Sequence, residues 1–422
     1  MRWQIMNLIK KYNETSLILR ILCGMIIGIV LGLLFKELSF ISILGDLFVG
    51  ALKAIAPVLV FVLVISALAK GQDKLDRRFG LVIALYLSST LLASITAVIG
   101  SFLFPQTIQL TTVAEADTIP SGVGEVLSGL FVNMVTNPLS AIIDGKYIGI
   151  LFWAIVIGLA AKRMASDNTK KVFEDISDIV SLTVRWIINL APFGIMGLVY
   201  TNVSQNGLSI FVDYGKLVLL LVVCMLLVAL VIDPLLAALV LKTNPYPLVL
   251  RCLRGSGLTA FFTRSSAANI PVNMALCERL GLDKEMYAVS IPLGATINMD
   301  GAAITIAVMA LAAANTVDIK VSFGTAIILA FISTLGACGA SGVAGGSLLL
   351  IPMACSLFGV GQDVAMQVVA VGFMIGVIQD SLETALNSSG DVMFAATAEY
   401  AQWKREGKSL PTFLGGTTKV DI

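Results

Sequence analysis

One short segment, Ile297–Ala303, interrupts an apolar run from Met286 to Ala314 with Asn298, Asp300 and Gly301. These three residue types weaken a helix, and an ionised Asp at membrane depth costs roughly 2.5–3.5 kcal/mol on insertion scales. Irregular backbone is tolerated at that depth where it lines a cavity or is buried in protein. Released carbonyls beside a carboxylate suit a hard monovalent cation, so the segment predicts an ion-coupled transporter.

Composition places the chain in a membrane. Its 422 residues are 57% hydrophobic and 13% charged, whereas soluble domains carry about 25% charged residues. We therefore expect an all-α polytopic membrane protein. The net charge of +1 argues against nucleic acid as a partner, and the lack of histidine excludes imidazole proton relays and His-ligated metal sites. The six cysteines form no CxxC pair and predict core thiols without a disulfide framework.

Basic residues set the expected orientation. Lys and Arg gather near residues 10–11, 70–78, 162–171 and 404–408, while the connection Pro105–Gly145 has none. The positive-inside rule then places both termini in the cytoplasm, which requires an even number of crossings. The first apolar run is too long for a signal peptide and is expected to remain as a span. Apolar segments that can cross or enter the membrane lie near residues 17–35, 41–69, 79–104, 148–161, 172–200, 208–241, 286–314, 323–358 and 360–398.

Two regions read as helical hairpins that enter the membrane and return on the same side. Residues 245–280 are apolar on both sides of a polar centre, Thr263–Ser266, and residues 322–358 repeat this pattern around a Gly-rich centre, Gly336–Ser347. Paired interrupted segments indicate a transporter site. Eight membrane crossings plus these two hairpins account for the apolar segments and leave both termini inside. The Gly-rich centre is also compatible with a close helix-packing surface.

The last apolar segment carries a polar stripe. Asp380, Thr384, Asn387 and Asp391 fall at i, i+4, i+7 and i+11, on one face of a helix. Such a stripe faces the protein interior or an aqueous cavity, although a polar seam between helices is the alternative. Two carboxylates there need counter-charges.

Three further groups of polar residues in apolar segments are candidate functional residues. Arg264 at the first hairpin tip is expected to pair with Glu383, and a protonated Glu383 or one at the cytosolic mouth are the alternatives. Tyr86, Ser89 and Thr90 form an oxygen cluster in the third span, although membrane Ser and Thr often bond their own helix. Asp233, before Pro234, predicts a kink without an assigned role.

Four blocks resemble the dicarboxylate/amino acid:cation symporter family: TRSSAANIPVNM at Thr263–Met274, GATINMDGAA at Gly294–Ala303, GASGVAGGS at Gly339–Ser347 and QDSLETALNSSGD at Gln379–Asp391. The similarity covers nearly the whole chain in the right order. It implies an elevator-type transporter of eight transmembrane helices plus two re-entrant hairpins, assembled as a homotrimer in lipid. Residues 1–78 and 105–207 would form the scaffold and oligomerisation part, residues 79–104 and 208–398 the transport domain, and residues 399–422 a cytoplasmic tail.

The resemblance also implies roles for individual residues. One sodium site would use the carbonyls of Gly294, Asn298 and Asn387 with the Asp391 side chain. A second would lie between carbonyls near Thr296 and those near Ala337, Cys338 and Ala340, and a third would use Tyr86, Ser89 and Thr90 with Asn298 and Asp300. The substrate carboxylate would meet Ser266, the Val343 region and Asn387, and Asp380 would take the ammonium. Ser265 and Thr384 complete the expected substrate-binding set.

Two departures from the family pattern bear on the substrate. Glu383 stands where members selective for acidic amino acids carry an arginine, and Ala302 stands where relatives have a threonine. An anionic side chain beside Glu383 would meet repulsion, so small neutral amino acids, most of all serine and threonine, are expected, and alanine would also fit.

The expected activity is therefore sodium-coupled import across the cell (inner) membrane, with sodium as the co-transported ion. The alternatives are proton coupling, a broader neutral amino-acid or dicarboxylate range, and an ion channel. A membrane-embedded enzyme is disfavoured, because the Ser265–Ser266 pair has no adjacent general base in the sequence.

Overall fold

The computed structural model describes residues 17–35, 37–69, 77–109, 134–338 and 345–420, together with residues 15, 131, 132 and 340. Over these residues the chain is helical, apart from one isolated β-bridge between Pro411 and Thr418. The expected all-α class is confirmed for this part of the chain.

The described elements of the first half of the chain are α2 (Leu17–Leu34), η1 (Ser39–Ile41), α3 (Ser42–Ala69), α4 (Arg77–Leu103), α6 (Pro138–Ile143), α7 (Tyr147–Met164), α8 (Asp167–Asn189), α9 (Ala191–Asn206) and η2 (Gly207–Ser209). Those of the middle of the chain are α10 (Ile210–Leu227), the π-helix η3 (Val228–Ile232), α11 (Asp233–Leu241), α12 (Tyr246–Cys252), the π-helix η4 (Leu253–Gly257), α13 (Leu258–Thr263), α14 (Ser266–Arg279) and α15 (Lys284–Ile297). The chain continues with α16 (Asp300–Thr316), α17 (Phe323–Ala337), η5 (Ser347–Leu350), α18 (Ile351–Ser356), α19 (Gln362–Arg405) and η6 (Thr412–Leu414).

Six helical stretches of the described chain are long and apolar enough to cross a membrane, and a seventh results if α8 and α9, bent by 51° at Leu190, form one span. The six stretches are Ser42–Ser66, Arg78–Leu103, Tyr147–Met164, Phe211–Leu241, Lys284–Thr316 and Gln362–Arg405. Shorter apolar helices lie at Leu19–Leu34, Phe323–Ala337 and Ser347–Ser356. The protein is therefore a multi-pass membrane protein.

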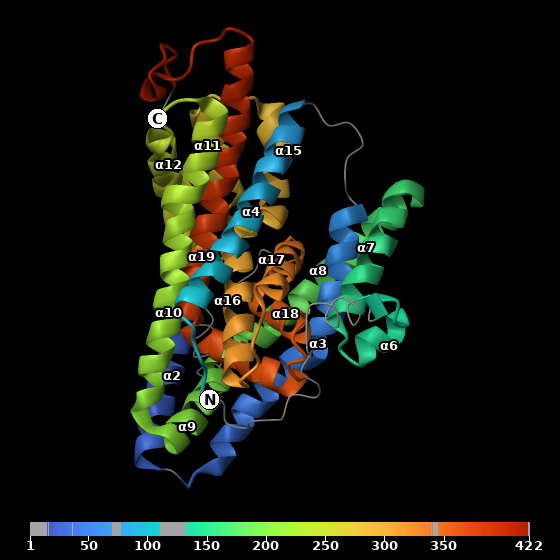
Figure 1. The fold of residues 1–422 in the computed structure, drawn as a ribbon, viewed down its shortest axis with the longest axis vertical. Coiled ribbons are helices and arrows are strands. Elements are labelled where there is room, and N and C mark those ends of the chain that lie inside the picture. The colour runs from blue at the N-terminus through green and yellow to red at the C-terminus, as the bar shows by residue number, and fades with distance from the viewer. Residues whose placement is uncertain are drawn as a thin grey trace, which may run out of the picture.

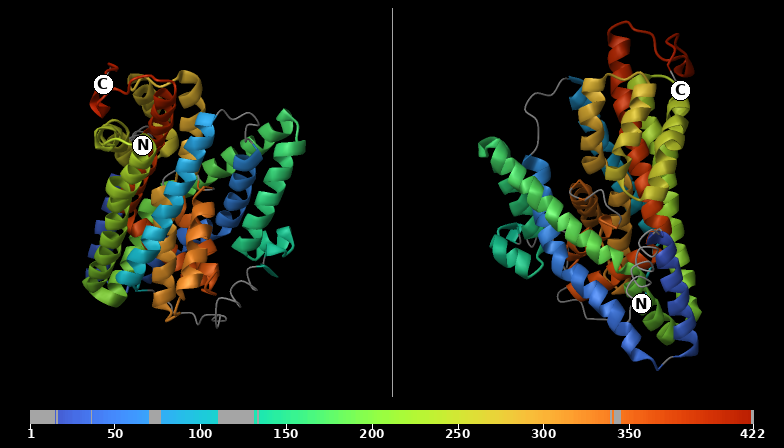
Figure 2. Two further views of the ribbon diagram at one scale, coloured as in Figure 1. Left: turned by 45° about the horizontal axis from the view of Figure 1, so that its top comes forward. Right: turned by 180° about the vertical axis from the view of Figure 1, so that it is seen from behind.

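The helices form two neighbouring groups. In one group α3 packs on α7, α8 and α9, and α2 packs on α9. In the other, α16 contacts α4, α17 and α19, and α10 and α11 also contact α19. Figure 1 and Figure 2 show α17 and α18 between the long upright helices and the group of α3, α7 and α8. Since α18 contacts α7 and η5 contacts α3, the second expected hairpin lies where the two groups meet.

Both expected hairpins have the helix–break–helix form that their sequences predict. In the first, α13 ends at Thr263, Arg264 takes a left-handed conformation with φ of +51°, and Ser265 caps α14 by accepting a hydrogen bond from the Ala268 amide. A serine at such an N-cap is a typical helix start. In the second, Ser322 caps α17, and η5 and α18 form the returning arm. Residues 339 and 341–344 of its tip lie outside the described part of the chain.

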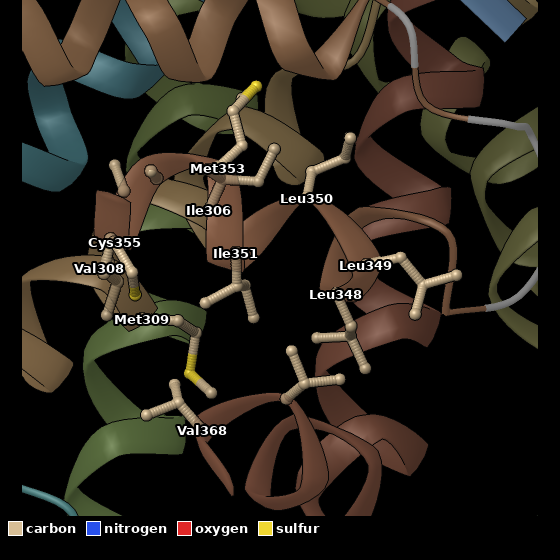
Figure 3. Packing of buried hydrophobic residues seen from close by; sticks show 14 of the residues in the cluster. Ile306, Val308, Met309, Leu348, Leu349, Leu350, Ile351, Met353, Cys355 and Val368 are labelled. Atoms are coloured by element: carbon tan, nitrogen blue, oxygen red, sulfur yellow. The ribbon is translucent and has the colours of Figure 1, made fainter. Parts of the chain in front are cut away.

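The core lies around α16. Every residue from Asp300 to Ala314 is buried, so the helix that carries the intramembrane Asp does not face lipid. Figure 3 shows Ile306 and Met309 of α16 among Leu348 and Ile351 of the second hairpin and Val368 of α19. The hairpin arm, α16 and α19 thus share one apolar core that surrounds the polar stripe.

Small residues allow the close contact between α2 and α9. A β-carbon placed on Gly28 would lie 2.6 Å from the Met196 carbonyl oxygen, and one on Gly24 would lie 2.2 Å from that of Pro192. A stripe of small residues is the usual means of bringing two membrane helices into contact.

We predict opposite effects for two glycine substitutions on neighbouring helices. Gly28→Ala should lower the free energy of unfolding by about 1–3 kcal/mol through overpacking. Gly50→Ala on α3, where nothing lies within 4 Å, should raise it by up to about 1 kcal/mol because alanine favours the helix. Thermal denaturation of the purified variants measures both, and equal shifts would contradict the packing argument.

Candidate functional site

The predicted break in the apolar run is confirmed. Helix α15 ends at Ile297 and α16 begins at Asp300, and the two residues between them, Asn298 and Met299, have non-helical backbone angles. Ile297 lies in the last turn of α15, and its carbonyl oxygen accepts no hydrogen bond from an amide of α16. The thiol sulfur of Cys338 lies 3.5 Å from this oxygen. The break therefore lies against the tip region of the second hairpin.

Helix α19 holds the break in place. The Asn298 Nδ2 donates to the Asn387 carbonyl at 3.0 Å and to Asp391 Oδ1 at 3.0 Å. The Gly301 amide donates to Asn387 Oδ1 at 2.8 Å. Asn387 and Asp391, the C-terminal pair of the predicted stripe, thus face the break from α19, and the stripe faces the protein interior as expected.

Two glycines make this approach possible. A β-carbon on Gly294 would lie 2.6 Å from Asp391 Oδ1 and 2.9 Å from the Tyr86 hydroxyl, and one on Gly390 would lie 2.7 Å from Asn298 Nδ2. Larger residues at either position would separate the α15 end from α19. The predicted site residue Gly294 therefore has a steric role here, besides the carbonyl that accepts the Asn298 amide at 2.9 Å.

Two oxygens of this group have no hydrogen-bond partner among the residues that the structure describes. Asn298 Oδ1 and Asp391 Oδ2 are buried and unpartnered, and both residues have no exposed surface. Leaving an acceptor in this state costs free energy. A cation bound between the α15 end and α19 would satisfy both oxygens, and oxygen ligands of this kind suit a hard cation. The donor set therefore fits sodium as a transported ion.

The predicted oxygen cluster of α4 joins the same region. Ser89 Oγ donates to Asp300 Oδ2 at 2.8 Å and Thr90 Oγ1 lies 2.8 Å from Asp300 Oδ1. The Tyr86 hydroxyl lies 3.0 Å from the Asp391 carbonyl and 3.3 Å from that of Ser290. All three side chains are fully buried. The structure thus brings together Tyr86, Ser89, Thr90, Asn298 and Asp300, although Tyr86 reaches the Asp391 backbone and not Asp300.

The expected ion pair between Arg264 and Glu383 is wrong. Arg264 Nε donates instead to Asp380 Oδ2 at 2.7 Å, and both side chains are buried. The left-handed backbone at Arg264 ends α13 and turns the chain at the tip. The other oxygen of Asp380 accepts the Gly345 amide at 3.2 Å, so Asp380 joins the tips of the two hairpins. Arg264 Nη1 has no partner among the described residues.

Glu383 has neutral partners. Its Oε2 accepts from Thr305 Oγ1 at 2.8 Å, from Ser347 Oγ at 2.9 Å and from the amide of Gln379. Gln379 also donates to Thr305 at 2.7 Å. These three donors come from α16, η5 and α19, so Glu383 ties the second hairpin to the core.

The remaining predicted residues are less informative. The Thr384 hydroxyl bonds the Asp380 carbonyl of its own helix at 2.8 Å, and Thr296 is exposed and bonds Leu293 in the same way at 2.7 Å. Ser265 caps α14 and Ser266 is buried in its first turn. Val343 lies outside the described residues.

Sequence reasoning missed three residues of this region, namely Thr305, Ser347 and Gln379, and it gave Asp233 no role. Gln379 precedes Glu383 by four residues, a spacing that places both side chains on one helix face and could have revealed it. Asp233 lies against Ser89, which bridges it to Asp300.

Comparison with known proteins agrees with this geometry. Residues 17–400 match the sequence profile described as the Sodium:dicarboxylate symporter family. A protein named Serine/threonine transporter SstT from Bifidobacterium adolescentis is 63% identical over 403 residues, which cover 96% of this chain and 94% of the relative. Proteins of the same name from Streptococcus agalactiae and Streptococcus thermophilus are 56% and 55% identical over 93% and 94% of this chain, and over 97% and 99% of their own lengths.

We predict that Asp391→Asn weakens stabilisation of the purified protein by sodium. The wild-type melting temperature should rise with NaCl relative to choline chloride, because a ligand that binds only the native state stabilises it. The Asn variant should need about tenfold more sodium or more for the same rise, since it loses an anionic ligand. Tyr214→Phe, which removes an unpartnered buried hydroxyl on α10, is the control and should respond as the wild type does.

Proposed function

This chain belongs to the sodium:dicarboxylate symporter family, and from that membership we propose that it imports serine and threonine together with sodium. It is a transporter and not an enzyme. The observation that carries the coupling is the pair of unpartnered buried oxygens, Asn298 Oδ1 and Asp391 Oδ2, beside a helix break. The substrate rests on the relatives, which are named serine/threonine transporters.

Sodium is proposed as transported cargo at the family's three positions. The first has Gly294, Asn298, Asn387 and Asp391, and the third has Tyr86, Ser89, Thr90, Asn298 and Asp300. Contacts of 2.8–3.0 Å between members of each set support these two. The second, between Thr296 and the region of Ala337, Cys338 and Ala340, is supported by the approach of Cys338 to the Ile297 carbonyl.

The amino acid is proposed to bind between the two hairpin tips and α19. Its carboxylate would meet Ser266, Asn387 and the Val343 region, and its ammonium would meet Asp380. Since Asp380 is paired with Arg264 in this structure, the ammonium has to replace or share that contact. Sharing keeps both cations beside the buried carboxylate, whereas full replacement would leave the buried Arg264 guanidinium without its partner.

Glu383 gives the proposed site its preference for neutral side chains. Its carboxylate stands one turn from Asp380 among the hydroxyls of Thr305 and Ser347, and Ala302 beside the break is fully buried and adds no polar group. A substrate carboxylate near Glu383 would meet like charge at a desolvated position. The hydroxymethyl side chain of a serine substrate would instead meet hydroxyl and amide groups that can form hydrogen bonds with it.

We propose the family architecture for the whole chain: eight transmembrane helices plus two re-entrant hairpins, in a homotrimer in the cell inner membrane with both termini cytoplasmic. Residues 1–78 and 105–207 would be the scaffold, residues 79–104 and 208–398 the transport domain that moves as an elevator, and residues 399–422 a tail. The distribution of Lys and Arg supports the orientation. The division of described helices into two contacting groups supports the domains.

Sodium-dependent uptake tests the proposed function. In proteoliposomes, serine uptake should require an inward sodium gradient, and an inside-negative potential of about 100 mV should add about 2.3 kcal/mol for each net charge moved inward, or roughly 40-fold accumulation. Unlabelled serine inside should accelerate uptake by counterflow, which a channel does not show. If uptake is unchanged without sodium but follows a pH gradient, the coupled ion is a proton and not sodium.

Exchanging the charge at Glu383 tests the specificity argument. Glu383→Arg should make aspartate a better competitor of serine binding by about tenfold or more, because repulsion becomes attraction, and Glu383→Gln should give a smaller change. Ser381→Ala, which removes an unpartnered hydroxyl two residues away on α19, is the control. If aspartate competes no better in either Glu383 variant than in the wild type, Glu383 does not face the substrate.

A further inference from the structure

Asp233 is a carboxylate on the buried face of α11, which also carries Pro234, Ala237 and Leu241. Its exposed fraction is 2%, whereas Val231, Leu235 and Leu239 nearby are 48%, 54% and 65% exposed. An aspartate at this depth is costly unless it has a partner. Its partner is Ser89 Oγ, which also lies 2.8 Å from Asp300 Oδ2.

The backbone is shaped to place Asp233 inward. The preceding residues, Val228–Ile232, form a π-helix, and the Asp233 amide bonds the Val228 carbonyl five residues earlier. A π-turn changes the phase of the residues that follow it and is frequent at functional sites. Pro234 follows directly and has no amide hydrogen to continue the ladder. The local irregularity is thus located where the carboxylate enters the core.

The hydroxyl groups beside Asp233 and Asp300 supply too few hydrogen-bond donors to satisfy both carboxylates. Ser89 has one hydroxyl proton and lies between Asp233 and Asp300, so it donates to one of them at a time. Thr90 has one proton and lies near both Asp300 Oδ1 and the Tyr86 carbonyl. No Lys or Arg of the described chain forms a salt bridge to either carboxylate within 4 Å. Two buried carboxylates that share two hydroxyls need a bound proton or another cation that the described chain does not supply.

A second observation concerns the same break. Asn298 Oδ1, which is fully buried and has no partner among the described residues, lies two residues before Asp300. The Met299 amide between them donates to Thr90 Oγ1 at 3.3 Å, and that hydroxyl lies 2.8 Å from Asp300 Oδ1. A cation at this break would therefore find the Asn298 oxygen and the Asp300 carboxylate in one short segment.

We propose that Asp233 is a second carboxylate that binds the coupling cation together with Asp300, and so sets the sodium affinity of this position. The proposal rests on sodium symport as proposed above. With two carboxylates at one position, the site attracts a monovalent cation more strongly than a single carboxylate does. The span that carries Asp233 is thereby coupled to the break between α15 and α16 through the bound ion.

The test uses the full-length protein in proteoliposomes and in detergent. Asp233→Asn keeps the shape and an acceptor for Ser89 but removes the charge. It should raise the sodium concentration for half-maximal serine uptake by about tenfold or more, while serine affinity at saturating sodium stays within about twofold of wild type. Asp233→Glu keeps the charge, so its half-maximal sodium concentration should lie between those of the wild type and Asp233→Asn. Ser94→Ala, an unpartnered buried hydroxyl farther along α4, is the control.

A double-mutant cycle separates a shared ion from separate effects. Asp233→Asn and Asp300→Asn should be non-additive in the sodium concentration that gives half-maximal thermal stabilisation, because both act on one cation. Unchanged sodium dependence in Asp233→Asn, or full additivity in the cycle, would overturn the proposal. If Asp233→Asn cannot be purified, a half-maximal sodium concentration of Asp233→Glu that is less than about tenfold above wild type supports the charge requirement, and a tenfold or larger rise overturns it. A wild-type protein without sodium dependence would instead reject the proposed function.

Discussion

The site depends on buried carboxylates that form no salt bridge with a basic side chain of the described residues. Asp233, Asp300 and Asp391 are at most 2% exposed, and Arg264, the buried cation nearby in the fold, is paired with Asp380. In an apolar core such charges are tolerated only with a counter-ion. The helix break, the close glycines and the hydroxyls of α4 are consistent with one requirement, which is to hold these oxygens around an ion that arrives from solvent and leaves again.

Much of this arrangement could be predicted from sequence because its signals are local. The break at Asn298 follows from residue types, and the Asp380–Asp391 stripe follows from helical spacing. The partner of Arg264 and the partners of Glu383 outside its own helix could not be predicted, because they depend on how other elements lie in three dimensions. The left-handed turn at Arg264 brings its side chain to Asp380, and Ser347 reaches Glu383 from an element 36 residues away.

Two π-helices deliver polar groups to the core, and neither has a recognisable sequence signature. Val228–Ile232 precedes Asp233, and Leu253–Gly257 contains Ser256 in the first hairpin arm. Ser256 Oγ lies 3.1 Å from Asn269 Nδ2 and 3.3 Å from Ser388 Oγ, so a buried polar network joins both arms of this hairpin to α19. The first hairpin is therefore anchored by hydrogen bonds along its length. The described hydrogen bonds of the second hairpin with α19 side chains lie near its tip, at Asp380 and Glu383.

Coupling between ion and amino acid follows from the position of Asn387. Its carbonyl accepts from Asn298, whose free oxygen is available to a cation, and its side-chain oxygen accepts from Gly301 at the start of α16. In the proposed mechanism, a cation on Asn298 would fix the orientation of Asn387 before the substrate arrives, and the amino acid would then bind a preformed partner at a lower entropic cost. Because linkage is reciprocal, the factor by which sodium raises serine affinity equals the factor by which serine raises sodium affinity. An ion site that shares a residue with the substrate site thus couples the two without a separate signalling element.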